Sequence, residues 1–257
     1  MPEEMSPQPL PDLPALLIGD AVVISDLHIG METKLKRKGF HIVSRTGDMI
    51  SALMSCPEEC RRLVILGDVK DTVPGRSRQE YLEIPAFFGK LMERYDRIDI
   101  VKGNHDTDLE EFIPFGIRIH QASGMVMGDT GLVHGHTWPS EEVMRCGTLV
   151  MAHEHPAVMF RDGVGRHMTE PCWVRGEIVS GGERYPEHPD RFVIVPAFNR
   201  LLGGSPVNVI DGKFLSPIIN SGMTDLDSSE IYLLDGIFLG KRADLMVRER
   251  DTNRRRR

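Results

Sequence analysis

The sequence predicts an α/β (α+β) fold, a four-layer αββα sandwich of two mixed β-sheets flanked by helices. Residues 21–25, 62–68 and 98–106 share one design, in which an apolar β-rich run ends abruptly in polar residues. Apolar residues at helical spacing separate the second run from the third, and such strand-helix-strand alternation is typical of a βαβ unit. From residue 117 onward, short apolar runs joined by tight turns indicate antiparallel strands. Parallel units followed by antiparallel strands favour two packed sheets with helices outside.

The individual elements follow in chain order. An amphipathic helix is predicted between the second and third runs, with Pro85 near its start or at a kink, from the spacing of Ile84, Phe87, Phe88, Leu91 and Met92. Residues 140–146 predict one or two helical turns. Further strands are predicted at residues 117–120, 124–129, 131–136, 147–156, 157–160, 191–198 and 231–239. We expect all of these elements to form one domain.

The composition is that of an ordinary globular protein, with 257 residues, 40% of them hydrophobic and 27% charged. No apolar run reaches the ~18 residues of a membrane span, and the acidic, proline-rich start does not resemble a secretory signal, so we expect a cytoplasmic protein. We expect a flexible lead-in over residues 1–14, the domain over 15–240, and a disordered tail over 241–257. That tail is basic, so it could contact a polyanion, but a solvated end is our expectation. The formal net charge of -7 argues against a broad electropositive surface for nucleic acid.

Polar side chains with metal-binding chemistry follow five of the predicted strands. They stand in Asp26-Leu27-His28, Gly67-Asp68, Gly103-Asn104-His105-Asp106, His134-Gly135-His136 and His153-Glu154-His155. Because a rigid sheet fixes where each loop begins, five strand ends can deliver these side chains to one point. Carboxylate, amide and imidazole ligands without thiolate favour manganese, iron or zinc at two neighbouring positions. Two ions need a shared ligand, and the lone carboxylate of Asp68 suits that role.

Each of these motifs taken alone has an ordinary explanation. A single histidine on a strand is more often a core or surface residue than a ligand, and an aspartate after glycine is more often a turn residue. Gly-Asn-His-Asp alone would pass as a polar loop. Five such features in one chain, each after an apolar strand, favour a metal centre over five coincidences.

In this order the motifs resemble those of the calcineurin-like metallophosphoesterase superfamily, over about residues 21–156. One position departs from the superfamily pattern, because Ala152 stands where glycine usually precedes the first histidine of the last motif. We expect a methyl group to be tolerated there. The segments SDLHIGMETKLKRKG near the start and VIVPAFNRLLGG at residues 193–204 are similar to the ICC-like branch. That branch includes archaeal proteins related to the nuclease subunit of DNA double-strand-break repair, and bacterial DNA-ligase-associated phosphoesterases.

The resemblance implies a role for each motif residue. It assigns one metal ion to Asp26, His28 and His155, and the other to Asn104, His134 and His153, with Asp68 as the bridge. A hydroxide between two divalent ions would then attack the phosphorus. The ions would be manganese foremost, with iron, zinc and nickel as alternatives. His105 would protonate the leaving oxygen, and Asp71 would orient that histidine unless it only caps the next segment.

Other residues are candidates for contact with the substrate. His136, Asn199 and Arg200 are assigned to substrate binding, although His136 is equally consistent with an ordinary loop histidine. The basic residues of segment 34–38 (KLKRK) would either contact a phosphate backbone or solvate a helix face, and the second is our expectation.

The sequence thus predicts an enzyme, a metal-dependent hydrolase of phosphodiester bonds in DNA, RNA or nucleotides. A phosphomonoester or a cyclic nucleotide is the alternative substrate. A non-catalytic module that uses the metal face to bind a protein partner is a further alternative. The presence of His105 and of all seven expected ligands argues against that last reading.

Overall fold

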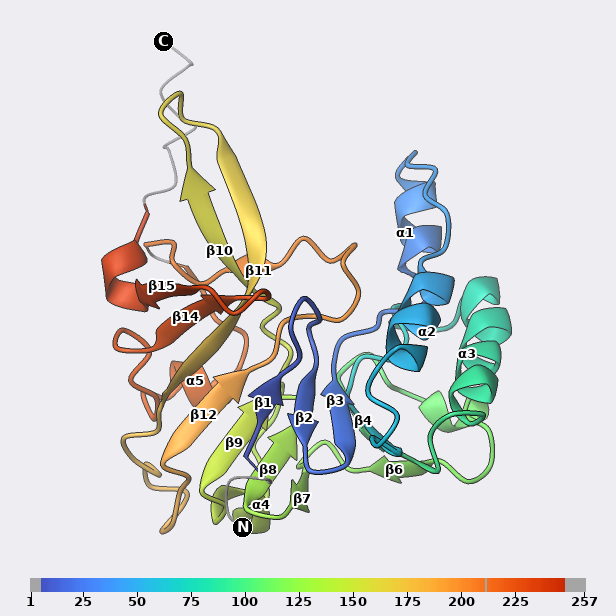
Figure 1. Cartoon of the computed structure of the whole chain (residues 1–257), viewed down its shortest axis with the longest axis horizontal. Helices are drawn as coiled ribbons and strands as arrows, with labels where there is room; N and C mark the ends of the chain where they lie inside the picture. The colour runs from blue at the N-terminus through green and yellow to red at the C-terminus, as the bar shows by residue number, and fades with distance from the viewer. Residues whose placement is uncertain (1–5, 211, 248–257) are drawn as a thin grey trace.

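The computed structural model describes residues 6–210 and 212–247, which form two β-sheets with helices on their outer faces (Figure 1). The first sheet has six strands in the order β1-β2-β3-β4-β5-β6. Their bounds are β1 Gln8–Pro9, β2 Leu16–Ile18, β3 Ala21–Ile24, β4 Arg62–Leu66, β5 Arg97–Val101 and β6 Arg118–His120. Strands β3 to β6 run parallel, so their carboxyl ends share one edge.

The second sheet has nine strands, seven of them in the order β13-β10-β11-β12-β9-β8-β7, with β14 paired to β11 and β15 paired to β14. Their bounds are β7 Met125–Met127, β8 Thr130–Val133, β9 Thr148–Met151, β10 Pro156–Arg161, β11 His167–Glu177, β12 Arg191–Ile194, β13 Ser205–Pro206, β14 Glu230–Leu233 and β15 Phe238–Lys241. Strands β8, β9 and β12 are parallel neighbours, and the other pairs are antiparallel except β10 with β13. Both sheets are therefore mixed, as the sequence predicted.

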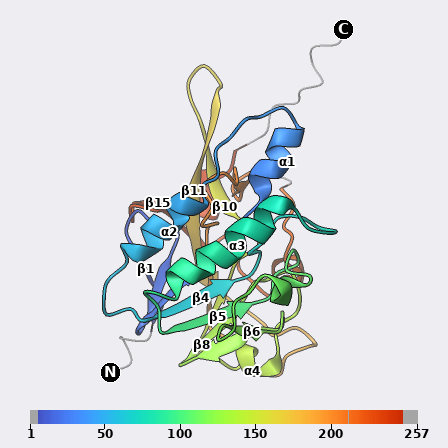
Figure 2. The same cartoon turned by 90° about the vertical axis from the view of Figure 1, so that its right-hand side faces the viewer.

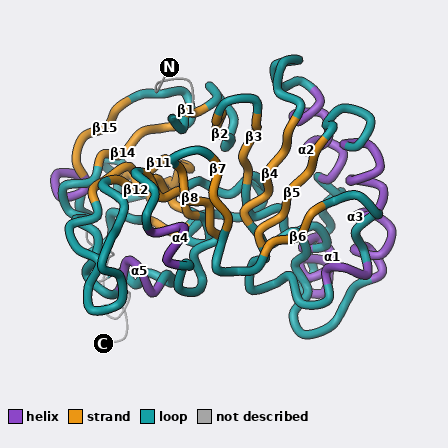
Figure 3. Tube along the Cα trace, turned by 90° about the horizontal axis from the view of Figure 1, so that it is seen from below, coloured by secondary structure: helices purple, strands orange, loops and turns teal. Residues whose placement is uncertain are grey.

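Five α-helices in the described residues flank the sheets. They are α1 Met31–Arg37, α2 Thr46–Met54, α3 Arg78–Leu91, α4 Glu141–Met144 and α5 Pro217–Asn220. Short 3-10 turns occur at Leu109–Glu111 and Arg242–Leu245. Figure 3 shows the helices on opposite outer sides of the paired sheets. No helix in the described part of the chain is both long and apolar enough to cross a membrane.

Alternation of apolar side chains along the central strands produces three buried layers. In β4, Leu63 and Ile65 pack against α2 and α3, whereas Val64 and Leu66 face the other sheet. A second outer layer lies between the nine-stranded sheet and α4 and α5. The middle layer joins Val64 and Leu66 to Val150 and Trp173 of the second sheet. Helix, sheet, sheet and helix thus follow one another, and the αββα prediction is confirmed.

The structure differs from the expected boundaries at both ends of the chain. The predicted lead-in 1–14 contains β1, which pairs with β2, so this part is held in the sheet. The predicted tail 241–257 contains the turn Arg242–Leu245, whose Arg242 is buried and donates to the Val207 carbonyl. Residues 1–5 and 248–257 lie outside the described residues. The strand expected at 231–239 is instead the hairpin of β14 and β15.

A buried carboxylate in the middle of β5, Asp99, ties β4, β5 and β6 together. Its side chain is fully buried and lies 2.8 Å from Arg62, 2.7 Å from Arg97 and 2.8 Å from His120. Burial opposes ionisation, but these three partners hold the pKa of Asp99 below its ordinary value. A lowered folded-state pKa stabilises the protein above the unfolded-state pKa, and this contribution is lost as the pH falls through the folded-state pKa.

We expect Asp99→Asn to lower the free energy of unfolding by about 2 kcal/mol at pH 7, because hydrogen bonds to charged groups are lost. The deficit should shrink below about pH 4, where the unfolded wild-type carboxylate takes up a proton. Urea unfolding from pH 3 to pH 8 measures both. Asp96→Asn is the matched control, since Asp96 is 69% exposed in its pair with Arg61 and should matter far less. An equal loss in both variants would contradict the argument.

Candidate metal centre

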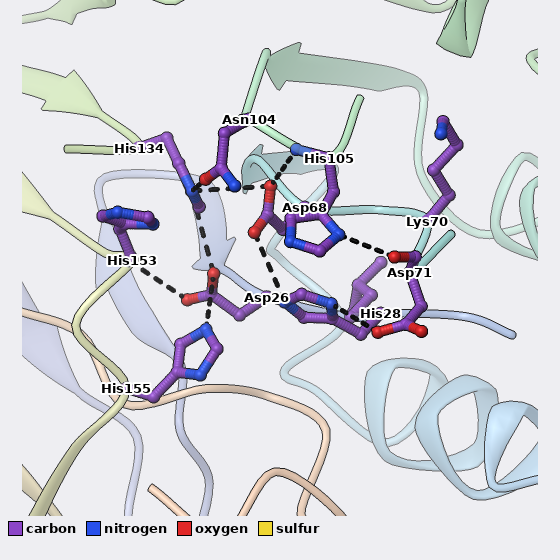
Figure 4. Close-up of polar contacts among 12 residues, drawn as sticks. Asp26, His28, Asp68, Lys70, Asp71, Asn104, His105, His134, His153 and His155 are labelled. Carbon is purple, nitrogen blue, oxygen red and sulfur yellow. Dashed lines mark hydrogen bonds and ion pairs between the residues drawn. The ribbon is translucent and has the colours of Figure 1, made fainter. Parts of the chain in front are cut away.

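The polar residues predicted from the five strand ends converge on one place in the structure (Figure 4). Asp26, Asp68 and Asn104 follow β3, β4 and β5, so the six-stranded sheet supplies them. His134 directly follows β8, while His153 and His155 lie in the short connection from β9 to β10. The centre therefore lies where the ends of both sheets meet.

Backbone strain is concentrated at these residues. Only seven non-glycine residues in the described chain have a positive φ, and five of them are predicted ligands: Asp26, His28, Asp68, His153 and His155. Their φ values range from 41° to 72°, the left-handed region that costs a side-chain-bearing residue about 1 kcal/mol or more. Such strain persists only where the surroundings impose it, and it clusters at functional sites.

The first group of converging side chains contains Asp26, His28 and His155. Asp26 is fully buried, and its Oδ1 lies 3.1 Å from Nε2 of His155. Burial alone would raise the pKa of Asp26, but His155 and His134 lower it below its ordinary value. The ring of His28 packs edge-on against that of His155, with their centroids 5.4 Å apart. These are the three residues predicted to share one ion.

The second group contains Asp68, His134 and His153, with Asn104 beside them. Nδ1 of His134 donates to the Leu66 carbonyl at 2.8 Å, and Nε2 is therefore the nitrogen that faces the centre. That Nε2 is 3.2 Å from Oδ1 of Asn104 and 3.5 Å from Oδ1 of Asp68. The rings of His134 and His153 are 4.8 Å apart. These are the residues predicted for the other ion.

Asp68 lies between the two groups and presents one oxygen to each. Its Oδ2 is 3.3 Å from Nε2 of His28, and its Oδ1 is 3.5 Å from Nε2 of His134. Although burial lowers the pKa of both histidines, the nearby carboxylates raise it to about 10 for His28 and about 9 for His134. The buried carboxylates therefore attract positive charge strongly at this point.

Asp106, the last residue of Gly-Asn-His-Asp, joins the two loops beneath Asp68, a role that we did not predict. It is buried, and its carboxylate accepts hydrogen bonds from the Val69 and Gly103 amides, both at 2.9 Å. A Cβ on Gly103 would lie 2.2 Å from Oδ1 of Asp68, so only glycine fits at that position. Burial raises the pKa of Asp106, and Asp68 adds to this effect.

Asp71 supports the site differently from the prediction. We expected its carboxylate to orient His105, but it is the Asp71 main-chain carbonyl that lies 2.7 Å from Nδ1 of His105. The Asp71 carboxylate instead lies 3.2 Å from Nδ1 of His28. The loop is held in turn by buried Glu80, whose Oε1 accepts from the Asp71 and Thr72 amides at 3.1 and 2.7 Å. Asp71 thus orients a predicted ligand with its side chain and His105 with its backbone.

The three residues assigned to substrate binding lie in different places. His136 is half-buried, with its ring 5.1 Å from that of His134 and 6.0 Å from that of His153, so it belongs to the edge of the centre. Burial and the neighbouring His134 lower its pKa to about 4. Asn199 is buried and donates to the Leu27 carbonyl at 2.8 Å, which supports the Asp26–His28 loop from behind. Arg200 turns away and donates to the Asp12 carbonyl.

The donor set fits divalent cations. Asp26 Oδ1, His28 Nε2 and His155 Nε2 are buried and form no hydrogen bond with any described residue, although they face one another. Buried polar atoms without hydrogen bonds are costly, and a cation between them would relieve that cost. Carboxylate, amide and imidazole donors without thiolate suit manganese, iron or zinc. Ala152 does not disturb this arrangement, because its methyl group is buried in the layer between the sheets.

Three comparisons set this chain beside known proteins. No family model and no curated protein matches the sequence. Among solved structures, a nuclease MPE from Pseudomonas putida is 19% identical with a TM-score of 0.49, over 89% of this chain and 96% of that one. The phosphoesterase Yfce from E. coli is 20% identical with a TM-score of 0.36, over 56% and 74%. A Vps29 variant from Entamoeba histolytica is 14% identical with a TM-score of 0.34, over 72% and 80%.

Similarity at this level leaves activity and substrate to be argued from the residues of this chain. Its own features are the two mixed sheets, the flanking helices and the polar motifs at five strand ends. The order of these motifs along the chain is the one that the sequence resemblance requires. The architecture is the two-sheet αββα sandwich expected from the sequence, and the motif order resembles that of the calcineurin-like metallophosphoesterases.

Proposed function

We propose that the protein is a dinuclear metal-dependent phosphodiesterase that acts on nucleic acid or nucleotides. The observation that carries this proposal is the position of Asp68, which presents one carboxylate oxygen to each of two ligand groups. A structural ion needs only one closed group of four ligands, whereas a shared carboxylate between two open groups is the arrangement of two-metal hydrolases.

Two ions would be held by the residues that the sequence resemblance assigned. Asp26, His28 and His155 would hold one, Asn104, His134 and His153 would hold the other, and Asp68 would contact both. When bound, the ions supply Lewis acidity towards phosphate oxygens and a nucleophile from water near neutral pH. We propose manganese as the bound metal, with iron, zinc and nickel as the alternatives.

The residues around the ions would complete the chemistry. His105 is half-buried beside Asp68, to whose Oδ1 its amide donates at 2.9 Å. With Nδ1 turned to the Asp71 carbonyl, its Nε2 remains available to give a proton to the leaving oxygen. His136 has a buried Nδ1 without a hydrogen-bond partner among the described residues, so it is a candidate to contact a substrate oxygen. Asn199 supports the Asp26–His28 loop, and Arg200 is engaged with the Asp12 carbonyl.

Removal and return of the metal tests this function. Protein stripped with a chelator and reloaded with Mn²⁺ should hydrolyse bis-p-nitrophenyl phosphate, and the stripped protein should be inactive. Metal analysis should give about two ions per chain in the reloaded protein. Hydrolysis of p-nitrophenyl phosphate alone would indicate the phosphomonoesterase alternative. Bound metal with neither activity would favour the protein-binding module. Cyclic nucleotides, DNA and RNA are the next substrates to compare.

A further inference from the structure

An exposed basic segment stands beside the metal centre. Residues 34–43, with the sequence KLKRKGFHIV, run from the middle of α1 into the connection to α2. Residues 36–43 are all exposed, including Phe40 at 59% and Val43 at 84%. In Figures 1 and 2, α1 stands at the same end of the molecule as the tip of the β10–β11 hairpin. We call residues 34–43 the basic arm.

The basic arm is fixed relative to the centre. Helix α1 begins three residues after His28, and the Ile29 and Asp71 backbones are joined by a hydrogen bond of 3.2 Å. On the inner face of α1, buried Glu32 accepts hydrogen bonds from the Arg45 amide at 2.8 Å and from Gln79 at 2.9 Å. The inner face is therefore tied to α2 and α3, while the outer face is left to solvent.

The arm also contacts one residue that supports the metal centre. Nζ of Lys34 lies 3.9 Å from the buried Asp71 carboxylate, although the lysine side chain is 59% exposed. The carbonyl of the same Asp71 orients His105, the residue proposed to protonate the leaving oxygen. Lys34 therefore marks the leaving-group side of the centre, and the rest of the arm extends outward from that side.

Three of the four lysine and arginine side chains of the arm have no ion-pair partner among the described residues. Lys36, Arg37 and Lys38 form no ion pair with any residue in the described part of the chain, and no acidic residue interrupts residues 33–47. This is a local positive excess in a chain whose net charge is -7. Free cations around an exposed aromatic ring combine phosphate attraction with a surface on which a base can stack.

We infer that the basic arm binds a single-stranded nucleic acid segment on the leaving-group side of the scissile phosphate. This inference rests on the proposed function and adds a substrate class to it. Lys36, Arg37 and Lys38 contact successive phosphates, and Phe40 stacks on an unpaired base. The small diester bis-p-nitrophenyl phosphate is too short to reach the arm, so the arm should matter only for polynucleotides.

The test compares the two substrates in Mn²⁺-loaded protein. The triple substitution Lys36→Ala, Arg37→Ala, Lys38→Ala should raise KM for a single-stranded oligonucleotide about tenfold and leave bis-p-nitrophenyl phosphate hydrolysis unchanged. Phe40→Ala should raise the oligonucleotide KM about fivefold. The matched control, Lys90→Ala, Arg118→Ala, Arg145→Ala, removes the same charge from exposed positions on α3, β6 and the end of α4 and should change neither substrate.

Binding gives a second readout that does not depend on turnover. In a His105→Ala background, the anisotropy of a labelled oligonucleotide should report weaker binding by the triple variant, with a salt slope smaller by about two. Equal losses in the control triple, or no change in the arm variants, would overturn the inference while leaving the phosphodiesterase intact. Oligonucleotides that the wild type neither binds nor cleaves would also overturn it. An inactive wild type on bis-p-nitrophenyl phosphate would instead refute the proposed function.

Discussion

Replacing Asp68 by asparagine is expected to reduce kcat for bis-p-nitrophenyl phosphate by about 10³-fold or more, because the carboxylate shared by the two ligand groups is lost. Asparagine has nearly the same shape and tolerates the left-handed backbone at this position, where φ is 51°. Its amide oxygen can still accept the hydrogen bond from the His105 amide. The substitution therefore removes charge while keeping the local geometry.

Metal content and stability separate this effect from misfolding. Elemental analysis of the Asp68→Asn protein should show fewer than two ions per chain, with a circular dichroism spectrum like that of the wild type. Asp20→Asn, at an exposed position before β3, is the control for an equal change of charge and should keep full activity. If the Asp68→Asn protein had the same kcat as the wild type, the shared carboxylate would not be required for the mechanism.

Replacing His105 by alanine is expected to lower kcat by about 10³-fold for substrates that expel an alkoxide, the range of a lost general acid. A dinucleotide has such a leaving group, because its ribose or deoxyribose oxygen is strongly basic and must be protonated. Nitrophenolate is a weak base and leaves without a proton, so bis-p-nitrophenyl phosphate should lose much less activity. The ratio of the two losses is the diagnostic quantity.

Two further variants define the role of His105. Asp71→Ala keeps the carbonyl that orients His105 and removes the carboxylate beside His28, so its loss should be similar for both substrates. His167→Ala, on the exposed start of β11, should leave both activities unchanged. Equal losses on both substrates in the His105→Ala protein would mean that His105 positions the site and transfers no proton.

The central strands were predictable because they are buried on both faces. Strand β3 is a continuous apolar run, β4 is apolar after Arg62, and β5 is apolar after Arg97 except for Asp99; polar residues follow each strand, and the structure places all three as expected. Strand β11 was not predicted, since its first four residues, from His167, are exposed in a protruding hairpin and carry no apolar pattern. The hairpin of β14 and β15 was read as one strand because the turn residues Asp235 and Gly236 interrupt only briefly.

The candidate site was predictable to the level of residue type and place. Its seven proposed ligands converge as expected, because each follows a strand whose end the sheet fixes. The role of Asp106 was missed, since its partners are backbone amides that leave no mark in the sequence. The position of Asp71 in the sequence predicted that it lies beside His105. The sequence does not indicate that its carbonyl contacts His105 while its carboxylate contacts His28. The contact of Arg200 with the Asp12 carbonyl could not be predicted, because the two residues are far apart along the chain.

The proposed ligands come from both sheets. The packing of the buried layer between the sheets therefore affects the geometry of the site. Asp68 and His28 follow strands of one sheet, whereas His134 follows a strand of the other. Leu66 and Val150 meet in the layer that sets how the sheets are aligned. A misalignment of about 1 Å can cost an enzyme about 10²-fold in rate. Buried apolar side chains with no reactive group thus determine the distance between the two ligand groups of the centre.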